Sequence, residues 1–526
     1  MTKEKAWFRH YPPQVPRSIT IPKIPVSQIL TNSANRSPED IALVFAPIKA
    51  EMTYGELEEK SNRFAGALQQ MIKKGDKVAM LLPNCLEMAI AFFGTLKAGG
   101  VIVPLNPRYT PNELQHVLAD SGTKAMICFE QMYPMVAQIK EGVMIENIIT
   151  VSMGPPSDIG IPFQRLVAGP LNYKEVEILP NDIAVIQYTA GTTGLSKGVM
   201  ITHKNIVSNV LQLNAFCWPM EKEKETFVVV VPPFHVAGLV NVISWGIYIG
   251  AKLVLLPKFN PAETMETITQ YKSSFFFGVP AIYAAMLGAM QEQYKFDSLK
   301  FCAIGTASCP LPLFQILDTI FPALTEGYGL TESTGVCFAN PIDGLKKAKS
   351  VGIPFSGVDV KIVDVDSGKK LNPGEKGEIL IKGPNIALGY WNHPEETEKV
   401  FGAGWLHTGD IGCLDEDGYL YVIDRIKDVI NVRGEKVSSV EIEQTLESHP
   451  SIAEAAAIGV PDQFWGEKII AFVVLREPQS VKLILAHCQK NLTDYKVPQE
   501  IRIVESLPRS GVGKILKRKL REDSAS

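Results

Sequence analysis

The sequence lacks paired cysteines and any block of charge of one sign. Its eight cysteines are scattered over 526 residues, with no CxxC spacing and no histidine cluster beside them. This pattern argues against a zinc site or a disulfide framework. Lys and Arg number 52 against 56 Asp and Glu, a formal net charge of −4, which is not typical of a dedicated nucleic-acid binder. We therefore expect reduced thiols, a cytoplasmic protein and no nucleic-acid partner.

The sequence also has no unbroken apolar run of the kind that crosses a membrane. Residues 226–251 contain no charged side chain, and these 26 residues would be long enough to span a bilayer. However, Pro232, Pro233 and three glycines interrupt them, so we expect a buried strand, a loop and a buried helix. A membrane transporter built on this segment is the alternative, which fractionation would test. Residues 1–18 are charged and Pro-rich with no apolar core, so we expect no secretory leader.

What the sequence does have is a repeated alternation of short apolar runs with longer helical patterns. Apolar residues make up 46% of the chain, and its length favours three to four domains at about 150 residues each. Such alternation predicts parallel sheets with helices on both faces. The expected strands lie at residues 78–82, 101–105, 125–129, 184–189, 252–256, 275–277 and 301–304.

After about residue 355 the pattern changes to short strands separated by Gly, Pro and Asp turns. Strands are expected at residues 358–364, 377–382 and 419–424, which predicts a small antiparallel sheet or barrel. Beyond residue 428 the pattern is α+β, with strands at 469–475 and 500–504 around a helix at 481–492.

One Gly-rich segment stands out as a candidate phosphate-binding loop. Directly after an expected strand, residues 188–198 read YTAGTTGLSKG. Glycines let backbone N–H groups approach an anion, threonine hydroxyls donate hydrogen bonds, and Lys197 supplies positive charge. The segment does not have the GxxxxGK[ST] spacing of a Walker A loop. Taken alone, it is also compatible with a flexible surface turn.

Five further motifs follow in a fixed order, and together with the loop they carry a family resemblance. They read PFH at residues 233–235, YGLTE at 328–332, GWLHTGD at 404–410, DRIKD at 424–428 and PRSGVGK at 508–514. The chain resembles the adenylate-forming superfamily, which contains acyl-CoA synthetases, firefly-type luciferases and the adenylation domains of peptide synthetases. The resemblance implies a large N-terminal domain over residues 1–424, with two parallel-type sheets and a small β-barrel. A hinge at 425–427 and a small mobile α+β C-terminal domain over 428–526 would follow.

The resemblance also implies the chemistry. A carboxylate attacks the α-phosphate of ATP, giving an acyl adenylate and pyrophosphate, and a second nucleophile then displaces AMP. Because an anion approaches an anion, cations and oriented dipoles must supply most of the catalysis. Lys514 would stabilise the developing charge, and Glu332, with Thr189, would bind Mg²⁺, which shares phosphate oxygens readily.

The remaining site residues follow from the same resemblance. Tyr328 would stack on adenine, Asp410 would accept the ribose hydroxyls, and Arg425 would contact ribose or phosphate. Taken singly, Asp410 could be a turn residue and Tyr328 a core aromatic. The residues expected to bind ATP or AMP are Thr189, Gly191, Thr192, Thr193, Gly194, Lys197, Gly305, Thr306, Ala307, Glu326, Gly327, Tyr328, Gly329, Thr331, Asp410 and Arg425.

Three further assignments concern the acyl group, the hinge and the acceptor. His235 would border the acyl carboxylate as a gate, although a lone histidine in an apolar segment is often a core residue. Lys427 lies at the hinge of the family. Expected acyl-pocket residues are Phe234, Ala237, Gly238, Gly278 and Val279, and expected CoA contacts are Arg433, Gly434 and Lys436.

The chain departs from the family pattern at several positions. Ala190 replaces the usual Ser and Ser196 the usual Pro in the phosphate loop. Residues 305–311 read GTASCPL instead of an SGGAPL-like stretch, and Ser438 and Ser439 stand where the family often has Pro. None of these changes removes an expected catalytic residue.

The acceptor and the acid are inferred by elimination. The chain ends 12 residues after Lys514, without a carrier domain, which favours CoA as acceptor. The expected pocket segments hold no charged side chain placed for a second carboxylate or an amino group, which favours a medium- or long-chain fatty acid. An aryl acid of the coumarate or benzoate type, a luciferase-like oxygenation, carrier-protein loading and a non-catalytic nucleotide-binding protein are the alternatives. Peripheral membrane contact and a dimer are compatible with the sequence.

Overall fold

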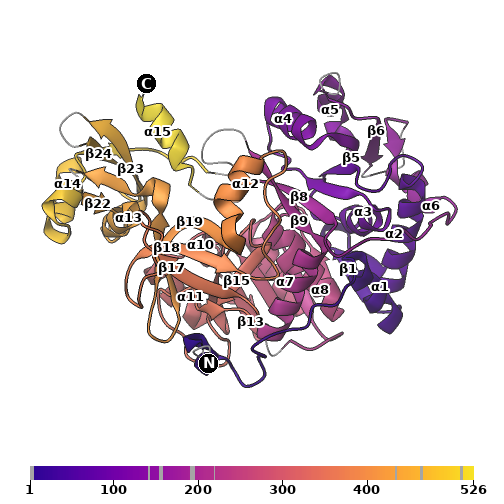
Figure 1. Ribbon diagram of the computed structural model, residues 1–526, viewed down its shortest axis with the longest axis horizontal. Coiled ribbons are helices and arrows are strands. Elements are labelled where there is room, and N and C mark those ends of the chain that lie inside the picture. Colours follow the sequence, from indigo (N-terminus) through magenta and orange to yellow (C-terminus); the bar gives the residue numbers. More distant parts are fainter. Residues whose placement is uncertain are drawn as a thin grey trace. The chain divides into compact units, whose positions relative to one another are not determined.

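The computed structural model describes most of the chain, in two compact units (Figure 1). The first unit comprises Met1–Asp359 and Ile381–Leu406, and the second Val360–Leu380 and His407–Ser526. The described residues are 5–139, 143–152, 154, 158–189, 196–217, 220–432, 435–462, 466–509, 513 and 515–525, without the side chains of 436 and 525. Each unit has its own sheets and core, so the two are treated separately.

A seven-stranded sheet lies in the N-terminal part of the first unit. Its order is β7-β6-β5-β3-β4-β8-β9, and all neighbouring pairs are parallel except β8 with β9. The strands are β3 (Lys77–Leu81), β4 (Val101–Pro104), β5 (Thr123–Phe129), β6 (Asn147–Val151), β7 (Ile161–Pro162), β8 (Ile183–Thr189) and β9 (Lys197–Thr202). Helices α4 (Pro111–Ser121) and α5 (Tyr133–Ile139) share a core with one face of this sheet, and Figure 1 shows them beside β5 and β6.

The second sheet of this unit has nine strands in the order β16-β15-β14-β13-β12-β10-β11-β1-β2. The run from β14 to β1 is parallel, and the strands beyond it are antiparallel. The strands are β1 (Ile41–Phe45), β2 (Ala50–Thr53), β10 (Thr226–Val229), β11 (Lys252–Leu255), β12 (Phe275–Gly278), β13 (Phe301–Ile304), β14 (Leu324–Leu330), β15 (Gly335–Ala339) and β16 (Ile353–Pro354).

Alternation of side chains along the parallel strands explains why both faces of this sheet are covered. Phe276 of β12 packs with helices α9 (Pro261–Tyr271), α10 (Pro280–Gly288) and α11 (Leu311–Ile320). Its neighbour Phe275 points the other way and stacks on Phe301, with ring centroids 5.1 Å apart, and it meets Trp245 edge to face at 5.2 Å. A strand buried on both faces reads as a continuous apolar run, as it does here.

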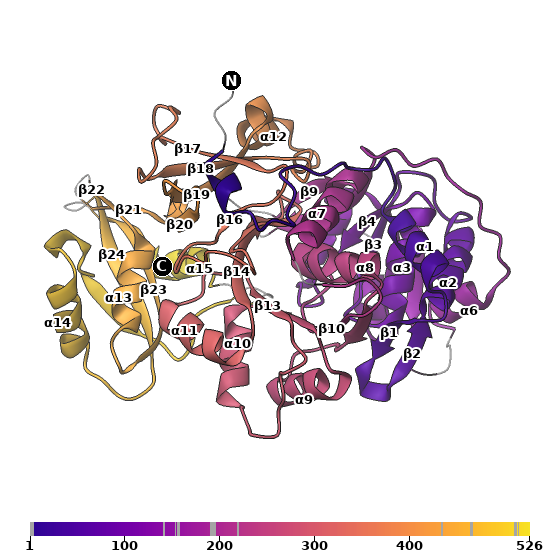
Figure 2. The ribbon, with the colours of Figure 1, turned by 90° about the horizontal axis from the view of Figure 1, so that it is seen from below.

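The remaining helices of the first unit surround the two sheets. Figure 2 shows α1, α2 and α3 grouped beside β1, in agreement with the packing of α3 against β1, β3 and β4. These helices are α1 (Ser27–Arg36), α2 (Tyr54–Leu68), α3 (Leu86–Lys97), α6 (Phe163–Ala168), α7 (His203–Phe216), α8 (Trp245–Ile249) and α12 (Pro394–Phe401).

The second unit contains two smaller sheets. One has the order β17-β18-β19-β20, and the other β22-β21-β24-β23 with β25 paired to β24. The strands are β17 (Asp359–Val363), β18 (Gly377–Lys382), β19 (Leu406–Leu414), β20 (Leu420–Arg425), β21 (Ile430–Val432), β22 (Glu435–Val437), β23 (Ile452–Asp462), β24 (Gly466–Leu475) and β25 (Glu500–Ile503). Three helices accompany them: α13 (Ser439–Glu447), α14 (Val481–Asn491) and α15 (Lys517–Ala525).

The C-terminal sheet is also buried on both faces. Ala471 and Val473 of β24 belong to the core shared with α13 and α14, whereas Ile470 and Phe472 belong to the core that contains Leu520 of α15. Figure 1 accordingly shows α15 apart from α13 and α14. Helices α13 and α15 therefore lie on opposite faces of the same sheet.

The predicted fold class is confirmed. Two large parallel-type sheets precede a small sheet and an α+β region, and the segment 226–251 forms β10, a loop and a buried π-helical stretch, Ala237–Ser244, that runs into α8. Within the described ranges, no helix combines the length and the apolar character needed to cross a bilayer. The four-stranded sheet occupies the place of the expected sheet or barrel and groups with the C-terminal unit. The domain boundary at 424 and the hinge at 425–427 stay predictions.

A capping box at the start of α2 gives a first testable prediction. Thr53 Oγ1 accepts the Glu56 N–H at 3.1 Å, while Glu56 Oε2 accepts the Thr53 N–H at 2.8 Å. Loss of such a cap costs about 1 kcal/mol, so we expect Thr53→Ala to speed amide hydrogen exchange in the first turn of α2 about fivefold. The equivalent box at Thr110 and Glu113 in α4 serves as internal control, and equal acceleration there would contradict a local effect.

Candidate nucleotide and acyl site

The predicted adenine and acyl residues of the first unit lie at or beyond the carboxyl ends of neighbouring parallel strands. Strands β14, β13, β12 and β10 are adjacent and parallel, so their carboxyl ends meet at one edge of the sheet. The segments that follow or finish these strands are 326–332, 305–307, 278–279 and 234–235. Open parallel sheets bind ligands at this edge, and the strand order therefore brings together residues up to 98 positions apart in the sequence.

The adenine-site candidates meet at the ends of β13 and β14. Ile304 pairs with Glu326 in register, and a Cβ built on Gly305 would lie 3.4 Å from the Gly327 carbonyl oxygen and 3.4 Å from the Phe277 ring. Thr306, next in the chain, has a left-handed φ of 67°, an unusual conformation for a β-branched residue. The two strand ends are thus in ordinary van der Waals contact at Gly305, and the assignment of residues 305–307 to the adenine site stays a prediction.

Glu326 is a buried carboxyl within this group. Its Oε1 accepts the Cys309 N–H at 3.0 Å, which ties β14 to the turn after β13. Burial raises the pKa of Glu326 to about 7, and the hydrogen bond from Cys309 opposes that rise. The carboxyl therefore takes up a proton near neutral pH, because its charged form is poorly solvated there.

Glu332, the candidate metal ligand, is held by a tyrosine that the sequence analysis did not identify. Tyr390 donates its hydroxyl hydrogen to Glu332 Oε1 at 2.8 Å. Burial and the nearby Glu332 carboxylate both raise the pKa of Tyr390 above its ordinary value. Tyr390 is therefore a neutral donor, and it holds one oxygen of the Glu332 carboxylate in place.

Lys197, the candidate phosphate-binding cation, contacts the segment that contains Tyr390. Lys197 forms an ion pair with Glu396 of α12, and its ammonium lies 5.9 Å from the centroid of the Tyr390 ring. The Lys197 side chain is 16% exposed. Lys197 and Glu332 thus face the same short segment, Tyr390 to Glu396, although they come from different sheets.

The base of the phosphate loop is an antiparallel hairpin. Thr189 at the end of β8 pairs with Lys197 at the start of β9. β9 is also paired on its other side, where the Trp391 N–H donates to the Gly198 carbonyl at 2.7 Å. The hairpin brings the two ends of the loop together, as an anion-binding loop requires. Gly191, Thr192, Thr193 and Gly194 lie outside the described residues.

The side chains of the first unit fit a magnesium ion that takes most of its ligands from elsewhere. Within the described ranges, no three His, Cys, Asp or Glu side chains gather to hold a metal. Glu332 and Thr189 offer a carboxylate and a hydroxyl, both hard oxygen ligands. Mg²⁺ is commonly bound by one or two carboxylates together with phosphate oxygens and water, so this sparse donor set suits it.

His235 and the expected acyl-pocket residues follow β10 and β12. His235 is half-buried, and its Nδ1 accepts the Ala237 N–H at 3.2 Å. The Phe234 carbonyl accepts from Gln187 of β8 at 2.9 Å. A Cβ at Gly238 would lie 2.2 Å from the Pro232 carbonyl oxygen, so this glycine lets the helix approach the loop closely.

Two other pocket candidates, Gly278 and Val279, stand at the end of β12. A Cβ at Gly278 would lie 3.0 Å from the Tyr283 ring, so the space beside it is filled by α10. Val279 is buried and caps α10. The assignment of Phe234, Ala237, Gly238, Gly278 and Val279 to the acyl group stays a prediction.

The second unit brings Asp410 and Arg425 together. They pair in register on β19 and β20, and Arg425 Nε lies 3.1 Å from Asp410 Oδ1. Asp410 is 4% exposed, so its carboxylate is held in place. Its two oxygens could accept the two hydroxyls of a ribose while Arg425 balances the charge.

Lys427, the candidate hinge residue, lies two positions after Arg425. Burial and neighbouring Arg425 lower the pKa of Lys427 to about 8. Arg433, Gly434 and Lys514 lie outside the described residues, as does the side chain of Lys436. Their roles stay predictions.

Sequence reasoning missed Tyr390, Glu396 and the Glu326–Cys309 bond. Tyr390 and Glu396 lie in the stretch GYWNHPEE at residues 389–396, where Pro394 and two glutamates read as the start of a helix. No local signal indicates that they face β9 and the residues that follow β14, because that contact depends on tertiary pairing.

Comparison with known proteins identifies the family. Residues 30–391 match the family model described as AMP-binding enzyme, and residues 441–514 match its C-terminal domain. The chain belongs to the AMP-binding enzyme family.

Individual relatives cover nearly the whole chain. It is 36% identical to a long-chain-fatty-acid–CoA ligase of Bacillus subtilis, over 99% of both chains. It is 34% identical to the ligase of the same name from Escherichia coli O6:H1, over 99% of this chain and 98% of the relative. A crystal structure of ATP-bound MatB from Rhodopseudomonas palustris is similar to it with a TM-score of 0.86 at 29% identity, covering 95% and 99% of the two chains. The adenylate-forming family predicted from the motifs is confirmed.

The raised pKa of Glu326 gives a pH-dependent prediction for this AMP-binding enzyme. A carboxyl with pKa about 7 when folded and 4.5 when exposed binds protons more tightly in the folded state. Its contribution to stability is therefore present at low pH and is lost as the pH rises from about 4.5 to 7. In Glu326→Gln, the amide oxygen can still accept a hydrogen bond from the Cys309 N–H. Between pH 5.5 and 8, we expect the thermal midpoint of this variant to fall by roughly 2–4 °C less than that of the unmodified protein.

The matched control is Glu266→Gln, an exposed glutamate on α9. Its midpoint is expected to follow the unmodified protein at both pH values. A Glu326→Gln variant with an unchanged pH profile would show that the carboxyl is ionised throughout this range.

Proposed function

We propose that this chain is an ATP-dependent acyl-CoA synthetase that activates a medium- or long-chain fatty acid. The acid attacks the α-phosphate of ATP to give an acyl adenylate and pyrophosphate, and the thiol of CoA then displaces AMP. The observation that carries the proposal is full-length similarity to long-chain-fatty-acid–CoA ligases, combined with an arrangement of Lys197, Glu332 and Tyr390 suited to a polyphosphate. Its eight thiols, unpaired in the structure, support a reducing, cytoplasmic setting.

Within the first unit, the phosphates of ATP would take over contacts that acidic side chains now make. Lys197 pairs with the Glu396 carboxylate, and a β- or γ-phosphate offers a stronger anionic partner. A bound Mg²⁺ would neutralise charge as the phosphate is attacked, with Glu332 as its carboxylate ligand and Thr189 as a second oxygen. Tyr390 would keep Glu332 oriented, because its hydroxyl already binds one oxygen of that carboxylate.

Roles in the second unit complete the proposal. Asp410 would hold the ribose hydroxyls, with Arg425 beside it, and Lys514 would approach the α-phosphate. Lys427 would be the pivot between an adenylating pose and a pose open to CoA. A hinge needs only a backbone that tolerates rotation, and the CoA contacts proposed for Arg433, Gly434 and Lys436 would supply positive charge to CoA phosphates.

The substrate class can be tested directly. With MgATP, we expect acid-dependent pyrophosphate release that peaks on fatty acids of about eight or more carbons, because the expected pocket residues are apolar or small. AMP formation should require CoA. A maximum on aryl acids would contradict the fatty-acid assignment while retaining the ligase. Pyrophosphate release without thioester would move the acceptor to oxygen or to a carrier protein.

The role of Lys514 can be tested by separating the two half-reactions. We expect Lys514→Ala to lower acyl-adenylate formation by about 100-fold or more, because a cation is lost where charge develops. CoA attack on supplied acyl adenylate should change much less. Lys519→Ala, at an exposed lysine of α15, is the control. Equal loss of both half-reactions in Lys514→Ala would contradict the assignment.

A further inference from the structure

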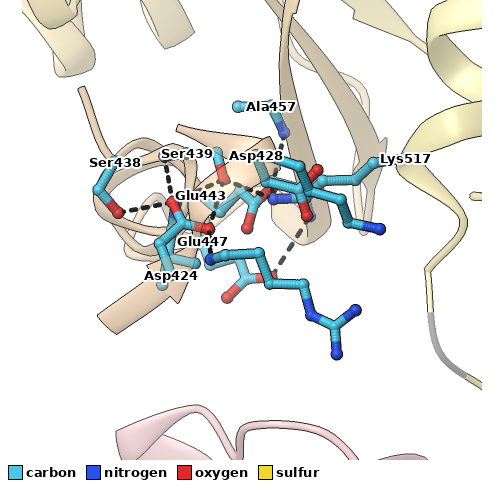
Figure 3. Close-up of polar contacts among 12 residues, drawn as sticks. Asp424, Asp428, Ser438, Ser439, Glu443, Glu447, Ala457 and Lys517 are labelled. Atoms are coloured by element: carbon cyan, nitrogen blue, oxygen red, sulfur yellow. Dashed lines mark hydrogen bonds and ion pairs between the residues drawn. The ribbon is translucent and has the colours of Figure 1, made fainter. Parts of the chain in front are cut away.

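The residue that precedes the proposed hinge is bound to helix α13. Asp424, in β20, is 7% exposed. Its Oδ2 accepts the Ser438 hydroxyl at 2.9 Å, the Ser439 N–H at 2.8 Å and the Ser439 hydroxyl at 3.0 Å (Figure 3). A carboxylate at a helix N-terminus satisfies N–H groups that have no partner within the helix and is stabilised by the helix dipole. Asp424 therefore fixes the end of β20 to the start of α13.

Ser439 extends this contact to helix α15. Its hydroxyl oxygen accepts from Lys517 Nζ at 2.7 Å, so the same hydroxyl can receive one hydrogen bond and donate another. Lys517 also pairs with Glu443 Oε1 at 2.7 Å, with side chains only 14% and 15% exposed. Figure 3 shows Ser439 and Glu443 on the same side of this group, facing Lys517. The chain Asp424–Ser439–Lys517 thus joins three elements.

Lys517 stands at the base of the segment that carries Lys514. It is the first residue of α15, three positions after Lys514. The segment is closed at its base by the Leu516 N–H, which donates to the Pro508 carbonyl at 2.8 Å, and by an antiparallel bridge between Arg509 and Ile515. Because α15 lies on the opposite face of the sheet from α13, the Lys517 side chain connects the two faces.

Ser439 is one of the positions at which this chain departs from the family pattern. A proline there would have neither an N–H nor a hydroxyl, and both of these groups of Ser439 are used. The departure therefore coincides with a hydrogen-bonded connection that a proline could not make.

We propose that Asp424, Ser439 and Lys517 are positioning residues, linked in series, that fix the Lys514 segment relative to the hinge strand and so place Lys514 for adenylation. The inference rests on the proposed function, because it uses the role of Lys514 in adenylate formation. None of the three residues needs to touch substrate. Their effect is to hold the end of β20, α13 and the base of the Lys514 segment together in the pose that forms the adenylate.

Ser439→Ala is the most selective variant. It removes the hydroxyl that joins Asp424 to Lys517, but keeps the backbone N–H that caps α13 and the Lys517–Glu443 ion pair. Removal of Lys517 would instead leave Glu443 buried without a counter-charge, which is costly to folding. Lys517→Arg keeps the charge but changes its reach, and serves as the second variant. Ser480→Ala is the control, since this exposed serine at the start of α14 makes no side-chain cap bond.

The experiment measures both half-reactions of the full-length enzyme with one fatty acid. We expect Ser439→Ala to lower acyl-adenylate formation about three- to tenfold, the loss typical of one ordinary hydrogen bond. CoA attack on supplied acyl adenylate should change less than about twofold, Ser480→Ala should match the unmodified enzyme, and Lys517→Arg should give a smaller shift in the same direction. Equal losses in both half-reactions would overturn the proposal.

A double variant tests whether the three residues act through Lys514. In a Lys514→Ala background, Ser439→Ala should cause no further loss of adenylation, because there is no longer a lysine to place. An additional loss of the same factor would overturn the proposal. If the unmodified protein releases no pyrophosphate with any acid, the proposed function fails. If it does and Ser439→Ala behaves as Ser480→Ala, only the positioning inference fails.

Discussion

The parallel pairing of β14, β13, β12 and β10 is the constraint on which the first unit depends. Strands β10, β12 and β13 are apolar and largely buried, so their polar backbone groups depend on neighbouring strands for hydrogen bonds. Once these strands are parallel, the segments that leave them emerge at one edge. Glu326, Gly305 and His235 are therefore near each other for a reason of topology, whatever their individual side chains prefer.

The charged side chains of Lys197 and Glu332 are each stabilised by a partner. Lys197 and Glu332 come from different sheets, and each is paired through the same segment, by Glu396 and by Tyr390. A partly buried cation and carboxylate without partners would be costly. In the proposed function, a phosphate would replace Glu396 as the partner of Lys197, and a metal ion would bind Glu332 beside Tyr390.

In the second unit, neutral hydrogen-bond donors stabilise a buried carboxylate. Asp424 is almost fully buried, yet the contacts to its carboxylate described above come from hydroxyl and N–H groups at the start of α13. Such donors hold a charge in place through geometry and the helix dipole. Lys517, on the next helix, joins this group through Ser439 while it neutralises Glu443. The result is a rigid connection across a sheet that is covered on both faces.

The sequence by itself determined the strands, the order of the motifs and the family, because apolar periodicity, Gly-rich loops and short motifs are local properties. The strands expected at 125–129 and 301–304 both occur. Only the tertiary structure decided that Tyr390 binds Glu332, that Glu396 pairs with Lys197 and that Ser439 joins Asp424 to Lys517. These partners are 58, 199 and 93 positions apart at their widest. Such contacts depend on which strand and helix surfaces meet, and that information is spread over the whole apolar core.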